Sequence, residues 1–233
     1  MQNNRSTQIH RMRFEHGIYR LDHQTLPGNY QPIKFIRIMI TRITAIQRLN
    51  QYIGHDLEEH ANRYGITIFA NGNQNKGWKG HTLERLAGLD NNNIQAPNGL
   101  GFEIKSTAFH QVKGSWEPKE TMAITRIDAK ILIETPFYKS HCWDKLKSLI
   151  FCAVSWNGKF NPKSVLLKAQ SFDFLEDECI VKEIEADYEL IRNKCKTQGF
   201  LALTGKDGKY IQARTKGIGH GSTTRAFYAR KNF

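Results

Sequence analysis

Glu103, Ile104 and Lys105 form the tripeptide whose residue types and spacing best fit a chemical reaction. In a β-strand, Glu103 and Lys105 project to one side while Ile104 points to the other, into the core. A carboxylate and an ammonium then share a cleft. Hydrolysis of a phosphodiester needs oxygen ligands for a divalent cation and a lysine that polarises water or steadies the phosphorane. The tripeptide supplies both, although an amphipathic surface strand can produce this pattern by chance.

The residues in front of this tripeptide predict the elements that position it. A loop rich in glycine and asparagine covers 71–80 and leads into a short predicted helix at 81–87, which carries Glu84. Ala96, Pro97 and Asn98 then precede the strand. The order of loop, helix and strand is consistent with a site built at the start of the strand.

The charge of the chain favours a polyanionic partner. Its 34 lysines and arginines exceed its 22 aspartates and glutamates, which gives a net charge of +12 over 233 residues. Nucleic acid fits this charge better than a membrane does, because no apolar run approaches the roughly 20 residues of a spanning helix. A basic ribosome-associated protein, or a merely soluble basic protein, is the alternative. The four cysteines show no CxxC pair or metal spacing, which favours reduced thiols in a cytoplasmic protein.

The length and the hydrophobic pattern predict one α/β domain, as a single core or as two lobes across a cleft. Residues 1–38 are polar and lack clear periodicity, so we expect a poorly organised appendage in front of a domain at 39–233. Within that domain the pattern predicts a mixed sheet flanked by helices. The predicted helices cover 43–64, with a solvated acidic face that includes Asp56, and 172–196, whose side opposite the apolar face is mostly acidic. The predicted strands cover 122–127, 131–134 and 149–154, and a basic segment from Lys145 is expected to run into the last of them.

The last 29 residues contain seven lysines and arginines against one aspartate, with aromatic residues between them. The segment 205–208 predicts a hairpin turn that joins strands at 200–203 and 210–213. The second of these strands would present Arg214 and Lys216 on one face, where they could contact phosphates or a guanine edge. A solubilising basic tail is the alternative to this nucleic-acid contact.

Taken together, these segments resemble the MutH mismatch-repair endonuclease and are similar to Sau3AI-like and MvaI-like restriction enzymes. The resemblance covers roughly residues 43–233 and implies a restriction-endonuclease-like core whose two arms grip duplex DNA in a cleft. The stretches that carry it are 76–80, 83–84, 101–105, 140–141, 145–147, 210–216 and 225–228.

The resemblance also implies a role for individual residues. Glu84, Asn98 and Glu103 would hold Mg²⁺, while Lys105 and Lys145 would complete the catalytic site. Arg214 would be the base-reading group, with Lys216 and Tyr228 near the recognised base and its methylation state. Arg225 is also expected to contact DNA. A GATC-like recognition site follows from the resemblance alone, and the spacing shared with the MvaI-like enzymes leaves another short site open.

Asn98 is the departure from the family, which has an aspartate at this position. A neutral amide keeps an oxygen ligand but loses the charge that offsets the dehydration of Mg²⁺, so metal affinity and rate should both fall. Three accounts compete. The chain is an inactive relative that still binds DNA, or Asp90 compensates for the lost charge, or position 98 is not the equivalent one.

The sequence therefore favours a Mg²⁺-dependent, type II restriction-like endonuclease that cleaves duplex DNA and pairs with a cognate methyltransferase. One alternative is a mismatch-repair nickase that responds to a MutL-like ATPase. Another is a catalytically weakened DNA-binding relative, and a third is an unrelated basic RNA-binding protein. His81, His141 and His220 show no metal-finger spacing and favour structural roles, and Trp78 and Trp143 are predicted to be packing anchors.

Overall fold

The computed structural model describes residues 12–15, 18–21, 36–37, 40–90, 100–158, 161–217 and 223–233. The chain divides into two compact units, Met1–Ile40 and Thr41–Phe233. This division lies close to the boundary predicted between residues 38 and 39. The first unit contains an antiparallel sheet of β1 (Met12–Glu15), β2 (Ile18–Leu21) and β3 (Ile36–Arg37). Most of the segment expected to be poorly organised lies outside the described residues.

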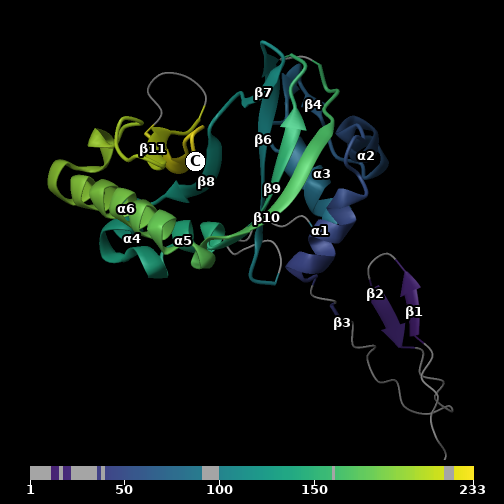
Figure 1. Ribbon diagram of the computed structural model, residues 1–233, viewed down its shortest axis with the longest axis horizontal. Coiled ribbons are helices and arrows are strands. Elements are labelled where there is room, and N and C mark those ends of the chain that lie inside the picture. Colours follow the sequence, from purple (N-terminus) through teal and green to yellow (C-terminus); the bar gives the residue numbers. More distant parts are fainter. Residues whose placement is uncertain are drawn as a thin grey trace, which may run out of the picture. The chain divides into compact units, whose positions relative to one another are not determined.

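The second unit contains helices and strands that are interleaved along the chain (Figure 1). Its α-helices are α1 (Arg42–Asn50), α2 (Leu57–Arg63), α3 (Trp78–Ala87), α4 (Ala129–Glu134), α5 (His141–Leu146) and α6 (Glu178–Gln198). Its strands are β4 (Phe69–Ala70), β5 (Asn73–Gln74), β6 (Glu103–Val112), β7 (Ser115–Pro118), β8 (Met122–Ile127), β9 (Ser148–Ser155), β10 (Leu166–Asp173), β11 (Ile211–Thr215) and β12 (Arg225–Ala229). Three short 3-10 helices are η1 (Phe137–Lys139), η2 (Phe174–Glu176) and η3 (Phe200–Ala202).

A four-stranded sheet in the order β10-β9-β6-β7 carries the tripeptide. The central pair β6 and β9 is parallel and its neighbours are antiparallel, so the sheet is mixed. Along the parallel pair, Glu103 lies opposite Leu149 and Lys105 lies opposite Phe151. The helices α1, α2 and α3 lie together beside this sheet (Figure 1). The predicted mixed sheet flanked by helices is confirmed.

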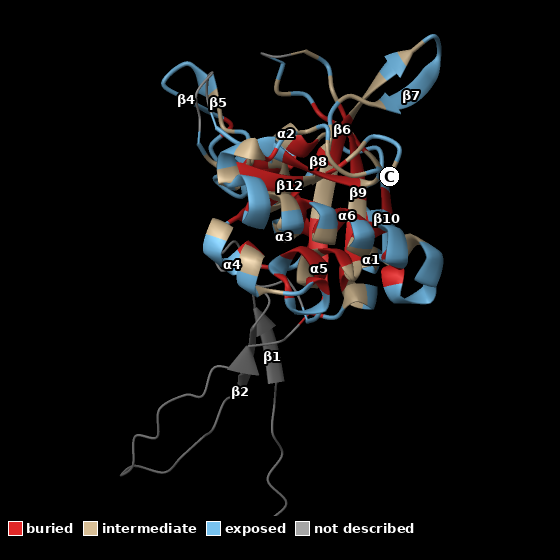
Figure 2. Ribbon diagram, turned by 90° about the vertical axis from the view of Figure 1, so that its left-hand side faces the viewer, coloured by how far each residue is buried: buried red, intermediate tan, exposed pale blue. Residues whose placement is uncertain are grey.

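A smaller sheet in the order β11-β12-β8 packs against α4, α5 and α6. Its core is aromatic: the rings of Phe137 and Trp143 lie 5.0 Å apart, and those of Tyr188 and Phe227 lie 5.4 Å apart. Burial follows these contacts, with buried faces turned inward in both parts of the unit (Figure 2). Trp78 and Trp143 are 1% and 4% exposed, so the prediction that they are packing anchors is confirmed.

The helix predicted at 43–64 is wrong in one respect, because it is two helices. The chain turns at Gly54, whose φ of +87° suits a glycine, and α2 starts after Asp56. Asp56 was predicted to belong to a solvated acidic face. Its carboxylate instead accepts hydrogen bonds from the backbone N–H groups of Glu58 and Ser164. Asp56 therefore caps α2 and joins this helix to the segment just before β10.

Three further boundaries differ from the prediction. Residues 131–134 belong to the helix α4, which Asp128 caps, and do not extend the sheet. The helix predicted from residue 172 begins at Glu178, because residues 172–173 still belong to β10. The predicted hairpin is wrong as well: residues 200–202 form η3, and β11 pairs with β12. The strand predicted at 122–127 is confirmed as β8.

All four cysteines are free thiols, and they differ in exposure. Burial raises the pKa of the Cys152 thiol to about 12 and raises that of Cys142 further, whereas Cys179 is exposed. We therefore expect a thiol reagent at neutral pH to label Cys179 alone in the native protein and all four cysteines after unfolding. Peptide mapping after timed labelling measures this, with Cys179→Ser as the control. Rapid native labelling of Cys152 would contradict the described packing.

Among the described residues, no helix is both long enough and apolar enough to cross a membrane.

Candidate active site and nucleic-acid interface

Two lysines converge on one buried carboxylate at the start of β6. Glu103 is 3% exposed, and its Oε1 accepts hydrogen bonds from Nζ of Lys105 at 2.8 Å and from Nζ of Lys145 at 2.9 Å. Glu103 and Lys105 therefore lie on the same face of the strand, as the alternation predicted. We call Glu103, Lys105 and Lys145 the catalytic cluster, after the role predicted for them. Lys145 was predicted from the resemblance alone, and the structure brings it across 42 residues of sequence.

The elements around the cluster explain how it is held. Lys145 lies in the last turn of α5, which starts where the Ser140 hydroxyl accepts from the backbone N–H of Trp143. The buried Trp143 and Leu146 anchor that helix in the core, so the backbone that carries the ammonium group of Lys145 is held in place. The helix α5 was not predicted, because the basic segment from Lys145 was expected to run directly into the strand β9.

Burial lowers the pKa of Lys105 from its ordinary value, while the carboxylate of Glu103 acts in the opposite direction. The charge of Lys145 lowers the pKa of Lys105 further, and that of Glu84 raises it. Glu84, on α3, is thus close enough to act electrostatically on the cluster. A lysine whose charge is this strongly opposed by burial responds to any anion or cation that enters the site.

The residues predicted to bind a metal fit a hard divalent cation as far as they are described. Glu84 and Glu103 supply carboxylate oxygens, the ligands that Mg²⁺ prefers. Asn98, the third predicted ligand, lies outside the described residues. Within the described ranges, no group of three or more histidine, cysteine, aspartate or glutamate side chains is arranged to hold a metal.

Asp90, the residue considered as a substitute for the missing charge, is engaged elsewhere. Its Oδ1 lies 2.8 Å from NH1 of Arg85, and its side chain is 72% exposed. This position on the surface does not support the account in which Asp90 compensates for Asn98.

A second cluster of predicted residues lies on the smaller sheet. Arg214 is exposed on β11, donates from NH1 to Oγ1 of Thr121 at 3.0 Å, and lies 5.8 Å from the ring centroid of Tyr228 on β12. Lys216 is also exposed, just beyond β11. Burial raises the pKa of Tyr228, so its phenol stays protonated and can donate a hydrogen bond. Thr121 was missed by sequence reasoning, because a lone threonine before a strand gives no signal of a distant arginine.

Arg225 differs from the other residues predicted to contact DNA. It is 9% exposed, and its guanidinium donates to the carbonyl oxygens of Leu203 and Leu201 at 3.1 and 3.5 Å. Its hydrogen bonds join β12 to the segment that contains η3. We therefore correct its assignment from DNA contact to a structural role.

Replacing Arg225 with methionine should destabilise the protein by about 2–4 kcal/mol, because carbonyl oxygens buried against the guanidinium would lose their donors. Chemical denaturation measures this change. Lys216→Met, which removes an exposed cation nearby, should change stability by less than about 0.5 kcal/mol. Equal effects of the two substitutions on stability would contradict the structural assignment.

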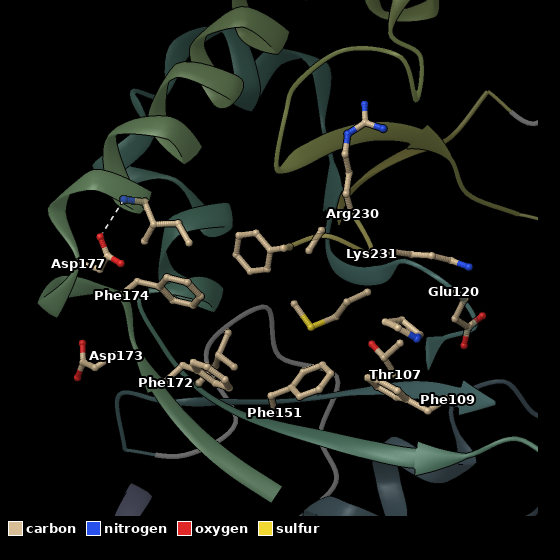
Figure 3. Close-up of a pocket in the computed structure, with 16 residues that line it drawn as sticks. Thr107, Phe109, Glu120, Phe151, Phe172, Asp173, Phe174, Asp177, Arg230 and Lys231 are labelled. Atoms are coloured by element: carbon tan, nitrogen blue, oxygen red, sulfur yellow. Dashed lines mark hydrogen bonds between the residues drawn. The ribbon is translucent and has the colours of Figure 1, made fainter. Parts of the chain in front are cut away.

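A pocket of about 380 Å³ lies between the two sheets (Figure 3). Thr107 and Phe109 line it from β6 and Phe151 from β9, on the same face of the sheet as Glu103 and Lys105. Aromatic rings dominate its wall, and the guanidinium of Arg230 points away from them. The wall also includes the carboxylates of Glu120, Asp173 and Asp177 and the cations of Arg230 and Lys231. We place the chemistry at the catalytic cluster because one buried carboxylate there contacts two ammonium groups directly.

Two of the three histidines considered as alternatives lie among the described residues. His81 and His141 are exposed and lie on different helices, α3 and α5. His220 lies outside the described residues.

A mixed sheet flanked by helices, with a carboxylate and a lysine on one face of a central strand, defines the restriction-endonuclease-like class of α/β protein. The model of the family described as DNA mismatch repair enzyme MutH matches residues 88–174. Over that part of the chain, the match supports a MutH/Sau3AI-like endonuclease and DNA as its substrate class. The match includes the whole catalytic cluster and ends before β11 and β12. No curated protein matches the chain.

Proposed function

We propose that this protein is a Mg²⁺-dependent endonuclease that cleaves duplex DNA at a short, GATC-like site. The observation that carries the proposal is the contact of one buried carboxylate, Glu103, with the ammonium groups of Lys105 and Lys145. A buried carboxylate held between two cations suits a reaction in which negative charge develops on a phosphate. The match to the MutH family model supports DNA as the substrate.

In this proposal each residue has a defined role. Glu103, Glu84 and Asn98 would hold Mg²⁺, which when bound lowers the pKa of water and offsets the charge of the phosphate. Lys105 orients the attacking water and stabilises the phosphorane oxygens. Lys145 keeps Glu103 ionised and oriented, and adds positive charge next to the phosphate.

Recognition would fall to the smaller sheet. Arg214 can donate two parallel hydrogen bonds to a guanine edge, and Lys216 beside it can follow the phosphate backbone. The ring of Tyr228 supports the guanidinium of Arg214 and limits the directions in which it can point. These residues lie on a different sheet from the catalytic cluster, so reading and cutting are performed by separate parts of the unit.

Incubation of the purified protein with unmethylated plasmid DNA, with Mg²⁺ and then with EDTA, tests the proposal. Discrete metal-dependent fragments are expected, and sequencing of their ends identifies the site. Fragments cut in both strands by the protein alone would support a restriction enzyme that works beside a methyltransferase. Intact plasmid together with no preference among duplex sequences in binding would overturn the proposal.

The description of the matched family as a mismatch-repair enzyme favours a second candidate, a nickase that acts with a MutL-like ATPase. In that case the plasmid should be nicked in one strand, slowly, and faster when such an ATPase is added. A third outcome, sequence-dependent binding without cleavage, would indicate a catalytically weakened relative in which Asn98 has disabled the metal site.

A further inference from the structure

A buried carboxylate on α6 holds the start of the strand that carries Arg214. Asp187 is 6% exposed, and both of its oxygens accept hydrogen bonds from main-chain N–H groups. Oδ1 accepts from Lys209 at 2.6 Å, and Oδ2 accepts from Tyr210 at 2.6 Å and from Ile211 at 2.9 Å. Burial of a charge is costly unless hydrogen bonds compensate for it, so these three contacts fix the backbone strongly.

The turn in front of β11, residues 205–210, is held at further points. Nζ of Lys194 on α6 contacts both oxygens of Asp207 at 2.8 and 2.9 Å. Arg230, just after β12, donates to the main-chain oxygens of Gly205, Asp207 and Gly208. These contacts tie the turn to a helix on one side and to a neighbouring strand on the other.

The conformation of the turn is also specific. Gly208 has φ of +82°, and a Cβ there would lie 1.9 Å from the carbonyl oxygen of Ile211 and 3.1 Å from Cγ of Asp187. Only glycine fits this close approach between the turn and the carboxylate. The backbone therefore reaches Asp187 in one arrangement.

Residues of this turn also contact Arg214. A Cβ added at Gly205 would lie 3.1 Å from Cγ of Arg214, so the aliphatic part of that arginine packs directly over the glycine. The carboxylate fixes the backbone from Lys209 to Ile211, and Arg214 follows three residues later on the same strand. Arg214 therefore contacts the turn through its aliphatic part, and Thr121 and Tyr228 through its guanidinium.

We propose that Asp187 is a positioning residue for sequence recognition, which acts on DNA only through Arg214. The inference rests on the proposed function, because it assumes that Arg214 reads a base. Specificity from a bidentate contact is lost when the arginine is displaced, since both hydrogen bonds need the same plane. Loss of Asp187 should therefore relax the base preference while the affinity for duplex DNA in general changes little.

The test is selection from a pool of duplexes with a randomised core, bound by the full-length protein with Ca²⁺ in place of Mg²⁺ and then sequenced. Wild-type protein should enrich one motif. Asp187→Asn, which keeps the shape but removes one acceptor and the charge, should lower the preference at one base pair by about tenfold or more. Arg214→Ala should lose preference at the same base pair.

The double variant distinguishes positioning from a general structural role. If Asp187 acts through Arg214, then Asp187→Asn with Arg214→Ala should lose no more preference than Arg214→Ala alone. Ile184→Val, one turn away on α6 and fully buried, serves as the matched control that lowers stability but should keep the motif. If Asp187→Asn does not fold, Gly208→Ala carries the test, because its Cβ would meet the carbonyl oxygen of Ile211 and Cγ of Asp187 and so move the turn away from the carboxylate.

An unchanged motif in Asp187→Asn, or an added loss in the double variant, would overturn the inference and leave the proposed function standing. An unchanged motif in Gly208→Ala would overturn it in the same way. No enriched motif with wild-type protein would overturn both.

Discussion

Glu103→Gln should abolish DNA cleavage, with a fall in rate of at least about 10²-fold. The amide keeps the shape of the side chain but removes the charge that holds Lys105 and Lys145 at 2.8 and 2.9 Å. It also removes a ligand charge from the proposed metal site. The measurement is the rate of plasmid cleavage at saturating Mg²⁺, beside affinity for the same DNA with Ca²⁺.

The cleavage rate and the DNA affinity of this variant should change differently. Because the lost carboxylate repels phosphate, the DNA affinity of Glu103→Gln should stay equal or increase while the rate falls. Glu117→Gln, an exposed glutamate on β7 of the same sheet, is the matched control and should leave both unchanged. Cleavage by Glu103→Gln at the wild-type rate would remove Glu103 from the mechanism, whatever happens to binding.

Asn98→Asp should increase the cleavage rate by about tenfold or more and lower the Mg²⁺ concentration required. The charges in the described part of the site support an increase in rate. Glu103 carries one negative charge against two ammonium groups, and Glu84 adds a second carboxylate nearby. A further carboxylate would supply the ligand charge that makes dehydration of Mg²⁺ favourable.

The measurement for Asn98→Asp is a Mg²⁺ titration of the cleavage rate. Asn92→Asp adds the same charge to the same segment and should have no such effect, which separates a ligand from a general change in field. An unchanged rate in Asn98→Asp would show that position 98 is not the metal position.

Local patterns predicted the centre of the site because they depend on local geometry. The alternation of a strand is enough to place Glu103 and Lys105 together, and the sequence at 78–87 was a helix with Glu84 on it, as expected apart from its first turn. The parallel pairing that brings β9 beside β6 was not visible, since nothing in either segment specifies its partner.

The errors have a common physical origin in long-range contacts. Asp187 was read as part of a solvated acidic face, although it is buried against residues 209–211. Arg225 was predicted to contact DNA, although it is 9% exposed and donates to carbonyl groups near η3. In both cases a charged side chain is buried because another part of the chain supplies its hydrogen-bond partner. The composition of the local sequence does not predict that partner.

The attachment of Lys145 to α5 has a mechanical consequence. Cys142, Trp143 and Leu146 of that helix belong to the same hydrophobic core as the smaller sheet, whereas Glu103 begins a strand of the larger one. The 2.9 Å contact between Glu103 and Lys145 therefore bridges the two halves of the unit. A motion that separated the two sheets would stretch this contact, so the distance between Glu103 and Lys145 would report how far the two halves have moved apart.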